Sequence, residues 1–483
     1  MLKPSLAVLD GRRFSSADQE AFARLSGDIN PIHMDPLAAR RSVVGAVVVH
    51  GVHIVLWALD VLARSKFGPP GLTRLEVRFL KPVYLGDEVI LILERRTDRD
   101  IQLRAVVGDR TVATLRLGCG PELSKAERDR DLPVDTAALV PSGAPENLAF
   151  DSLSGRAGHV DFAAPVQDFT SAFPAAASLV GPGRLREFAA CSRLVGMVCP
   201  GLRSLFSHLS LEWEGPGSSV PLTYEVVKTH SQYGLVKMRC RAEGLVGEAE
   251  AFAPAEPQRQ ASISDLVAAV RAGEFQEQVA LVIGGSRGLG ELTAKVIAAG
   301  GGRVLLTYAV GRDDAARVAA EIRDFGGRVD LLQYDVTQPA ARQLSGLGDS
   351  IPTHVYYYAT CHISRARTQA FEPERLARFM AYYVYGFYDL CRCLKDAGPR
   401  EVRVFYPSSV FVADRPRELT EYAMAKAAGE VLCADLPNLL PGIRVFVERL
   451  PRLMTDQTSS VVRQELAPAV DTILSLIRKG STS

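Results

Sequence analysis

The stretch from residue 278 to residue 309 constrains the fold more than any other part of the sequence. It reads QVALVI, the glycine-rich turn GGSRGLG, the helical run ELTAKVIAA and then RVLLTYA. A strand, a glycine turn, a helix and a second strand in this order form a βαβ unit. Further apolar stretches at 329–336, 353–360, 402–410 and 443–450 have strand character, with helical runs between them. The pattern predicts a Rossmann-like, doubly wound parallel sheet.

The residues before this unit show a faint internal repeat. An apolar run at 42–62 is suited to a buried helix, and 193–213 shares its glycine-containing start and its apolar composition. Each run is followed by strand-like sequence, at 72–97 and 223–244. A helix wrapped by an antiparallel sheet, present twice, fits this pattern. Chance similarity between two apolar runs is the alternative.

Charged or turn-rich stretches at 121–135, 141–147 and 253–262 separate these parts. They predict three segments, 1–120, 145–252 and 264–483.

The bulk composition excludes several classes of protein. The chain has 483 residues, 56 basic and 55 acidic side chains and a net charge of +1, which does not favour a nucleic-acid partner. The eight cysteines show no zinc-binding or disulfide spacing, so we expect no metal and a reducing compartment. We find no signal peptide and no apolar run of about 18 residues. The sequence therefore predicts a cytoplasmic protein without a membrane span.

The segment SGDINPIHMDP, residues 26–36, places Asp28 and His33 on either side of an Asn-Pro pair. Pro31 fixes its own backbone and makes Asn30 extended, so the chain bends stiffly between the two titratable residues. Such a bend can aim both side chains at one water, as acid–base chemistry requires. A bare Asp and His at this spacing more often form a structural hydrogen bond in a turn.

The context around this pair is similar to the signature of the MaoC-like hot-dog family of (R)-specific enoyl thioester hydratases and dehydratases. The matching residues include Phe22, Ser26-Gly27, Asn30-Pro31, Ala38-Ala39 and His50-Gly51. The resemblance implies that Asp28 and His33 are the acid–base pair and that the Gly51 N–H stabilises the thioester oxygen. Asn30 is expected to hold the loop, and no catalytic role follows for His50 or His53.

The segment 145–252 lacks the Asp-His motif, so it is expected to be a degenerate second repeat. The overall fold class implied is an α+β double hot-dog followed by the α/β sheet.

The glycine turn is accompanied by Tyr422 and Lys426, four residues apart, and by Ser409 thirteen residues before Tyr422. On a helix, this spacing puts the tyrosine and the lysine on one face. A nearby ammonium is expected to lower the pKa of the tyrosine phenol, which suits proton transfer.

This region resembles the short-chain dehydrogenase/reductase family over about 200 residues. The resemblance implies that Tyr422 protonates a carbonyl oxygen, Ser409 hydrogen-bonds it and Lys426 holds the nicotinamide ribose. The expected cofactor-binding residues are Gly284, Ser286, Arg287, Gly288, Leu289, Gly290, Asp335, Val336 and Lys426. The second strand ends without an acid for a ribose 2′-hydroxyl, whereas Arg287 or Arg312 can meet a 2′-phosphate, so NADPH is expected.

Several residues depart from the reductase pattern. They are Ile283 for the usual Thr, Tyr357-Tyr358-Ala359-Thr360 for Asn-Asn-Ala-Gly, Tyr383 for the relay Asn, and Pro451-Arg452 for Pro-Gly. The family's last strand, which forms a dimer edge, is also not found.

Together the two resemblances imply a 3-ketoacyl thioester reductase joined to a 3-hydroxyacyl thioester dehydratase. The expected substrate is an acyl thioester on an acyl carrier protein or on coenzyme A. Two alternatives are a hydratase with a silent reductase-like domain and a carrier-binding scaffold. The sequence does not decide whether the protein forms a homo-oligomer.

Overall fold

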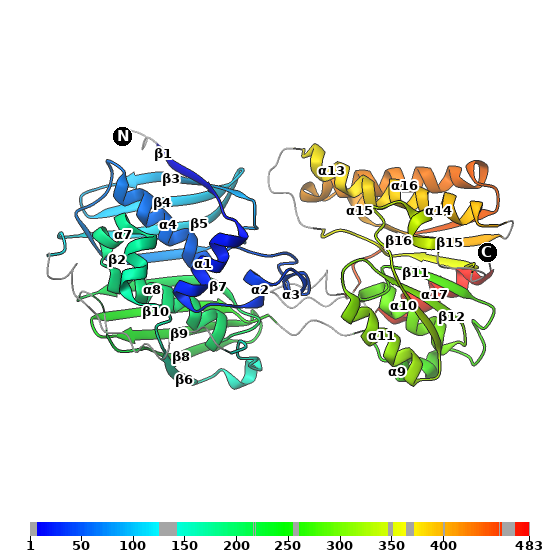
Figure 1. Ribbon diagram of the computed structural model, residues 1–483, viewed down its shortest axis with the longest axis horizontal. Coiled ribbons are helices and arrows are strands. Elements are labelled where there is room, and N and C mark those ends of the chain that lie inside the picture. Colours follow the sequence, from blue (N-terminus) through cyan, green and yellow to red (C-terminus); the bar gives the residue numbers. More distant parts are fainter. Residues whose placement is uncertain are drawn as a thin grey trace. The chain divides into compact units, whose positions relative to one another are not determined.

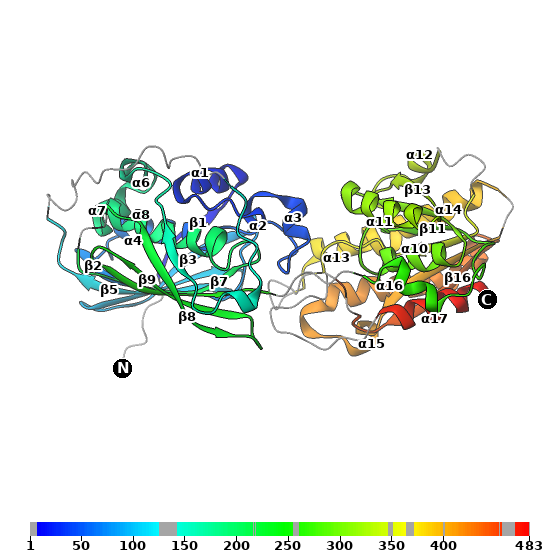
Figure 2. The ribbon, with the colours of Figure 1, turned by 90° about the horizontal axis from the view of Figure 1, so that it is seen from below.

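The computed structural model describes residues 7–124, 143–215, 217, 219–254, 260–345, 351–363, 371–398, 401–453, 455 and 469–482. The chain forms two compact units, the first up to residue 256 and the second from residue 257 onward (Figures 1 and 2). Most of the stretch 121–135 and part of 253–262, both expected as connections, lie outside the described residues. Among the helices described, none is long and apolar enough to cross a membrane.

The first unit is built on one ten-stranded antiparallel sheet (Figure 1). Its strand order is β1-β3-β4-β5-β2-β7-β10-β9-β8-β6. The strands are β1 (Ala7–Arg13), β2 (Gly71–Phe79), β3 (Glu88–Arg96), β4 (Asp100–Val107), β5 (Arg110–Gly120), β6 (Ala157–Val160), β7 (Leu205–Trp213), β8 (Leu222–His230), β9 (Leu235–Ala242) and β10 (Leu245–Phe252).

The sheet consists of two five-stranded halves with the same internal order. Read from its outer edge, the first half runs β1-β3-β4-β5-β2 and the second runs β6-β8-β9-β10-β7. The halves join where β2 and β7 pair antiparallel, with Val77 opposite Leu209. This pairing makes the two halves share one sheet and one apolar core.

Each half places helices on the inner face of the sheet. They are α1 (Ser16–Ser26), α2 (Pro31–Met34), α3 (Pro36–Arg40) and α4 (Gly51–Arg64) in the first half, and α6 (Val166–Ala172), α7 (Pro174–Val180) and α8 (Pro182–Arg193) in the second. A 3-10 turn spans Phe150–Ser152, and α8 continues as a π-helix over Leu194–Val198. Helices α4 and α8 contact each other beneath the sheet.

Two helix expectations need correction. The first helix begins at Gly51 rather than near residue 42, because the valine-rich segment before it forms turns and bends and Val48 bridges to Tyr84. The run 193–213 is not a second such helix. Its second part is strand β7, and the helix of the second half lies earlier, over Pro182–Arg193. The helix Pro182–Arg193 carries the charged residues Arg186 and Glu187, and both are buried. Because charged residues usually indicate a surface helix, the sequence does not reveal that this helix is interior.

The stretch 141–147 is also more than a connection where it is described. The Glu146 N–H donates to the Met197 carbonyl, and the Glu146 carbonyl accepts from the Leu202 N–H. The chain therefore pairs here with the end of the π-helix and the turn after it.

The second unit contains a six-stranded parallel sheet of order β13-β12-β11-β14-β15-β16. The strands are β11 (Val279–Ile283), β12 (Arg303–Tyr308), β13 (Arg328–Gln333), β14 (His354–Tyr357), β15 (Val402–Ser409) and β16 (Ile443–Leu450). All six coincide with strands expected from the sequence. No seventh strand occurs among the described residues of this unit.

Helices cover both faces of this sheet. One apolar core lies between the strands and α9 (Ile263–Leu266), α10 (Gly288–Ala299), α11 (Arg312–Asp324) and α17 (Ala469–Thr482). The other contains residues of α12 (Ala340–Leu344), α13 (Pro373–Met380), α14 (Gly386–Asp396) and α16 (Thr420–Leu439). Short segments are a π-helix over Ala381–Tyr385, 3-10 turns over Val267–Ala269 and Arg417–Leu419, and α15 (Phe411–Asp414). Strand residues alternate between the two cores, as Val282 and Ile283 do.

A buried lysine joins the start of the second unit to its sheet-covering helices. Lys295 Nζ lies 2.8 Å from Glu291 Oε1 and 2.8 Å from Glu321 Oε2. It also donates to the Ala261 carbonyl, while the Ile263 N–H donates to Glu321. Removing the ammonium would leave two carboxylates close together with little access to water.

We predict that Lys295→Met lowers the free energy of unfolding of the second unit by about 2 kcal/mol, because Glu321 loses its buried partner while Glu291 keeps its bidentate pair with Arg317. Scanning calorimetry of the full chain measures this as a lower unfolding temperature of that unit. The control is Lys479→Met, whose exposed pair with Glu448 should contribute less than about 1 kcal/mol. Equal effects of the two substitutions would contradict the prediction.

Candidate active sites

The loop between α1 and α2 presents Asp28 and His33. Helix α1 begins with a capping box between Ser15 and Asp18 and ends at Ser26, followed by Gly27 in the left-handed conformation. Helix α2 begins at Pro31, and the Asn30 side chain caps it by accepting from the Ile32 N–H. Two helix ends and one proline thus fix the short segment that carries the acid and the base.

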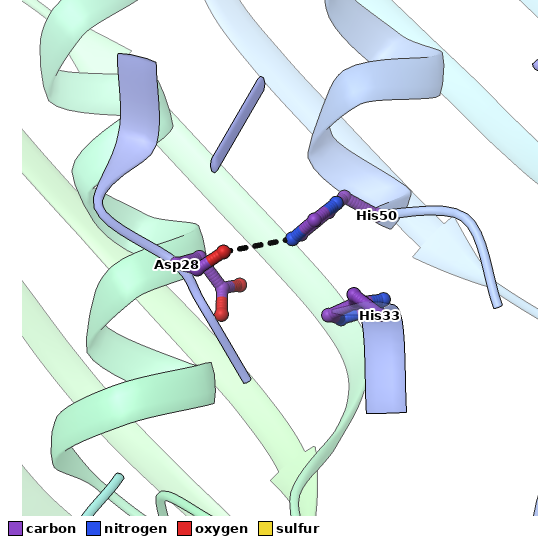
Figure 3. A group of neighbouring side chains, drawn as sticks. All are labelled: Asp28, His33 and His50. Atoms are coloured by element: carbon purple, nitrogen blue, oxygen red, sulfur yellow. Dashed lines mark hydrogen bonds between the residues drawn. The ribbon is translucent and has the colours of Figure 1, made fainter. Parts of the chain in front are cut away.

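Asp28 and His33 lie close together, and His50 completes a group of three (Figure 3). One ligand-type side-chain atom from each lies within 4.8 Å of the others. His33 Nδ1 is 2.8 Å from the Val48 carbonyl, which only accepts hydrogen bonds. The proton must therefore be on Nδ1, which leaves the Nε2 lone pair of a neutral His33 available as a base.

The Asp28 carboxylate is held in a dry site. The residue is 2% exposed, and burial raises its pKa, although the neighbouring His33 and two hydrogen bonds oppose the shift. One hydrogen bond comes from the Ser192 hydroxyl of α8, at 2.7 Å from Oδ2. A Cβ on Gly196 would lie 2.3 Å from Asp28 Oδ1, so only glycine leaves room for the carboxylate. Both neighbours come from the second half.

Asn30 ties the catalytic loop to the same part of the second half. Its amide nitrogen lies 2.6 Å from the Gly196 carbonyl and 3.3 Å from each of the Gly201 and Leu202 carbonyls. The side chain is fully buried. This agrees with the expectation that Asn30 holds the loop.

The second half contains no Gly-Asp-x-Asn-Pro-x-His motif. Helix α7 is followed by Gly181 with a positive φ, as α1 is followed by Gly27, and Pro182 rather than an aspartate comes after that glycine. The N-terminal start of α7 is capped from the first half of the sheet unit. Asp60 Oδ1 accepts from the Ala175 and Ala176 N–H groups at 2.9 and 3.0 Å.

Gly51 is the first residue of α4 and directly follows His50. No acceptor for its N–H is found among the described residues. An unsatisfied N–H at the positive end of a 14-residue helix is suited to an oxygen that gains negative charge. The role of Gly51 as an oxyanion donor stays a prediction.

The second unit brings Ser409, Tyr422 and Lys426 together. Ser409 ends β15, and the other two lie on α16. Burial raises the pKa of Tyr422 to about 12, and a hydrogen bond with Ser409 opposes the shift. The expectation that an ammonium lowers this pKa is wrong for the protein as described, because desolvation dominates.

Lys426 is enclosed by aromatic rings. Its Nζ lies 4.0 Å from the centre of the Tyr383 ring and 5.0 Å from that of Tyr406, and it donates to the Pro407 carbonyl at 2.6 Å. Burial lowers its pKa to about 7. Tyr383 therefore contacts the lysine through its ring face, while its hydroxyl is hydrogen-bonded to Thr360.

The glycine turn fits a dinucleotide. Gly284 has a φ of 77°, and a Cβ on Gly290 would lie 2.3 Å from the Gly284 carbonyl oxygen. The turn therefore needs glycine at both positions. Helix α10 starts at Gly288 without a side-chain cap, and the Leu289 and Gly290 N–H groups have no partner within the described residues. Orphan N–H groups at such a helix start bind phosphate oxygens.

The other expected cofactor residues lie in this turn or just after strand β13. Arg287 precedes α10, with its Nε 3.8 Å from Asp314 Oδ2. Ser286 Oγ approaches Gly311, just before α11. Asp335 and the buried Val336 follow β13, and Asp335 accepts from the Thr337 N–H and hydroxyl. Two of the departing tyrosines have structural hydrogen bonds. The Tyr357 hydroxyl donates to the Tyr382 carbonyl, and the Tyr358 hydroxyl accepts from the Thr293 hydroxyl.

Comparison with known proteins assigns the family. Residues 5–115 match the model of the MaoC like domain. The (R)-specific enoyl-CoA hydratase of Aeromonas caviae is 30% identical over 105 residues, which are 22% of this chain and 72% of that protein. The chain belongs to the MaoC-like dehydratase family.

A short-chain dehydrogenase domain follows the MaoC-like domain in the same chain. Residues 278–352 match the model of the short chain dehydrogenase family. The mitochondrial 3-hydroxyacyl-[acyl-carrier-protein] dehydratase of Arabidopsis thaliana is 30% identical over 107 residues, 22% of this chain. The chain spans 64% of that protein's length, less than two thirds. A solved structure of the angucycline C-6 ketoreductase LanV with bound NADP is 27% identical, covering 37% of this chain and 73% of that one at a TM-score of 0.33.

Sequence reasoning missed the contribution of the second half to the MaoC-like site. Ser192 and Gly196 lie in a segment without any catalytic motif, and only the folded structure brings them to Asp28. The histidine of the His50-Gly51 step was noted but given no role. Gln19 was not singled out either, although it is buried and donates to the Val48 and His33 carbonyls.

We predict that Ser192→Ala raises the pKa of Asp28 further, because the hydroxyl stabilises the carboxylate form by hydrogen bonding. A ¹³C NMR titration of the Asp28 carboxyl carbon measures this shift. Ser178→Ala is the control, since its exposed hydroxyl bonds only the Pro174 carbonyl of its own helix. An Asp28 titration that is unchanged in Ser192→Ala would contradict the prediction.

We also predict a pH-dependent stability from Lys426. Its pKa is about 7 in the folded protein and about 10.4 in an unfolded chain, so the unfolded state binds more protons between these values. Stability therefore rises with pH across that window. In Lys426→Met this contribution to the slope should vanish, as urea unfolding followed by circular dichroism at pH 7 to 9.5 measures. The control Lys395→Met should keep the wild-type slope.

Proposed function

We propose that the protein is a bifunctional enzyme of acyl-chain processing. Its first unit would interconvert an enoyl thioester and water with an (R)-3-hydroxyacyl thioester. Its second unit would reduce a 3-ketoacyl thioester to the 3-hydroxy compound with NADPH. The observation that carries the proposal is the placement of the buried Asp28 carboxyl close to the free Nε2 of the half-buried His33.

The first unit is interpreted as a double hot-dog, with each half supplying one helix wrapped by five strands. Support comes from the repeated strand order and from the helices α4 and α8 that pack beneath it. The second half would be the degenerate repeat, since it lacks the Gly-Asp-x-Asn-Pro-x-His motif. Its function would be to complete the single site through Ser192 and Gly196.

The residues suggest how each proton moves during hydration. His33 Nε2 would accept a proton from the water whose oxygen adds to C3. The Asp28 carboxyl, whose pKa burial raises, would supply the proton to C2. The Gly51 N–H would donate to the thioester oxygen while negative charge gathers there. In dehydration the same groups would act in reverse, with Asp28 as the base and His33 as the acid.

In the second unit, NADPH would supply the hydride that adds to C3 of the ketoacyl group. The Tyr422 hydroxyl would donate its proton to the carbonyl oxygen, and Ser409 would hydrogen-bond that oxygen. Lys426 lies one helical turn from Tyr422 and would hold the nicotinamide ribose. NADPH over NADH is proposed from Arg287 at the glycine turn and from the missing acid after β12.

The two activities would be consecutive steps on one substrate position. The reductase would make the 3-hydroxyacyl thioester that the dehydratase converts to the enoyl product. Joining them in one chain raises the effective concentration of the intermediate when the linker permits transfer. The thioester carrier would be coenzyme A or an acyl carrier protein.

A silent reductase-like domain is the competing proposal. It is favoured by the enclosure of Lys426, whose Nζ already donates to Pro407 and faces the Tyr383 ring. In that case the protein would act on enoyl and 3-hydroxyacyl thioesters alone.

We predict that Asp28→Asn and Tyr422→Phe separate the two activities, each falling by about a hundredfold or more because a proton-transfer group is removed. Purified protein is given NADPH and a short 3-ketoacyl thioester, and the products are resolved by mass. Asp28→Asn should accumulate the 3-hydroxyacyl thioester. Tyr422→Phe should leave NADPH unoxidised and still hydrate an enoyl thioester.

Matched substitutions provide the controls. Asp35→Asn keeps the cap of α3, and Tyr388→Phe alters an exposed ring, so both should behave as wild type. Absence of NADPH oxidation by the wild-type protein, with hydration intact, would establish the silent domain. Absence of both reactions would refute the proposed function.

Asp28→Asn should also unfold at the same or a higher temperature. The pKa of Asp28 is higher in the folded than in the unfolded state, so ionisation of Asp28 opposes folding as the pH rises above its unfolded pKa. The neutral amide of asparagine removes this effect.

A further inference from the structure

We propose that His50 is a positioning residue that holds Asp28, His33 and the Gly51 N–H in one arrangement. This inference rests on the proposed hydratase function of the first unit and adds a residue to it. His50 is completely buried and is the residue immediately before α4 (Figure 3).

The first contact fixes the backbone of the acid. His50 Nε2 lies 3.0 Å from the backbone carbonyl oxygen of Asp28 (Figure 3). Because the carbonyl only accepts, the ring must carry its proton on Nε2. The bond joins α4 to the loop after α1, at the residue whose carboxylate is used.

The second contact fixes the ring of the base. The rings of His50 and His33 are stacked, with centroids 3.9 Å apart and planes 25° from parallel. On the His50 ring, Phe22 makes a further contact at 4.8 Å between centroids. His33 is thus held between its Val48 hydrogen bond and a flat neighbour that is itself immobilised.

The charge state of His50 suits this role. Burial lowers its pKa well below the usual value, and the neighbouring His33 lowers it further. A neutral His50 leaves His33 as the imidazole that accepts a proton.

An unused nitrogen argues against a purely space-filling role. His50 Nδ1 is buried and has no hydrogen-bond partner among the described residues. A buried polar atom without a partner is unfavourable, and a phenylalanine of similar shape would avoid it. The feature of histidine that the structure uses is therefore the Nε2–H bond to Asp28.

His50 also precedes the oxyanion donor without any intervening residue. Its carbonyl accepts from the His53 and Ile54 N–H groups, so the residue belongs to the first turn of α4. Its backbone N–H faces the Gln19 side chain, 3.4 Å from Oε1. A shift of His50 would move the Gly51 N–H relative to the acid–base pair.

Two substitutions test the two contacts separately. His50→Phe keeps a flat ring against His33 and removes the donor to Asp28. His50→Gln keeps a donor and removes the ring. We expect each to lower kcat for hydration of a short enoyl thioester by about tenfold to a hundredfold, with KM changed less than about threefold, because only the geometry of the reacting groups is altered.

His53→Phe is the matched control. This histidine is buried on the same helix and stacks on Phe22 at 4.9 Å. In the described part of the chain, no hydrogen bond or ring contact joins His53 to Asp28 or His33. The kcat of His53→Phe should therefore equal the wild-type value. A merely structural role for His50 predicts that His50→Phe is fully active and as stable as wild type in thermal unfolding. That result would overturn the proposal.

A second measurement does not depend on turnover. NMR of ¹⁵N-histidine-labelled wild-type protein should show His50 neutral with its proton on Nε2, and His33 with its proton on Nδ1. A His50 proton on Nδ1, or a charged His50 ring at neutral pH, would overturn the proposal even if His50→Phe failed to fold. Wild-type protein that hydrates no enoyl thioester but shows these tautomers would refute the proposed function and leave the His50 geometry standing.

Discussion

The site of the first unit depends on one physical condition, which is that a carboxylate can be kept out of water next to an imidazole. Asp28 meets this condition because the π-helix after α8 brings Gly196 against its oxygens and α8 brings the Ser192 hydroxyl to Oδ2. Asn30 fastens the loop to the same carbonyls. The two halves that supply these contacts share one sheet through the β2–β7 pairing, so the fold itself brings these neighbours to Asp28.

The sequence was most informative where local physics decides the structure. Pro31 and the capping residues fix the bend between Asp28 and His33, and the six parallel strands are short apolar runs with turn residues between them. The glycine turn is equally local, because a Cβ at Gly290 would strike a neighbouring carbonyl. Such features depend on a few consecutive residues, and periodicity and turn chemistry reveal them.

What the sequence concealed was the helix of the second half and its role. Arg186 and Glu187 look like surface residues, yet both are buried, the first against the Phe162 ring and the second as the acceptor of the Trp213 indole N–H. Their partners are 24 and 26 positions away along the chain. Long-range pairing of this kind leaves no periodic trace, so Ser192 on the same helix could not be connected to Asp28. The pKa of Tyr422 was misjudged for a related reason, since desolvation depends on the whole surrounding core.

Covalent duplication has a consequence for how this site can vary. In a symmetric pair of identical subunits, each substitution appears at both equivalent positions. Here the second half lacks the motif that carries Asp28 and His33, and Asp60 binds the N–H groups at the start of α7. One half is therefore free to differ from the other at every position. The candidate site is therefore asymmetric, although the two halves of the sheet around it share one strand order.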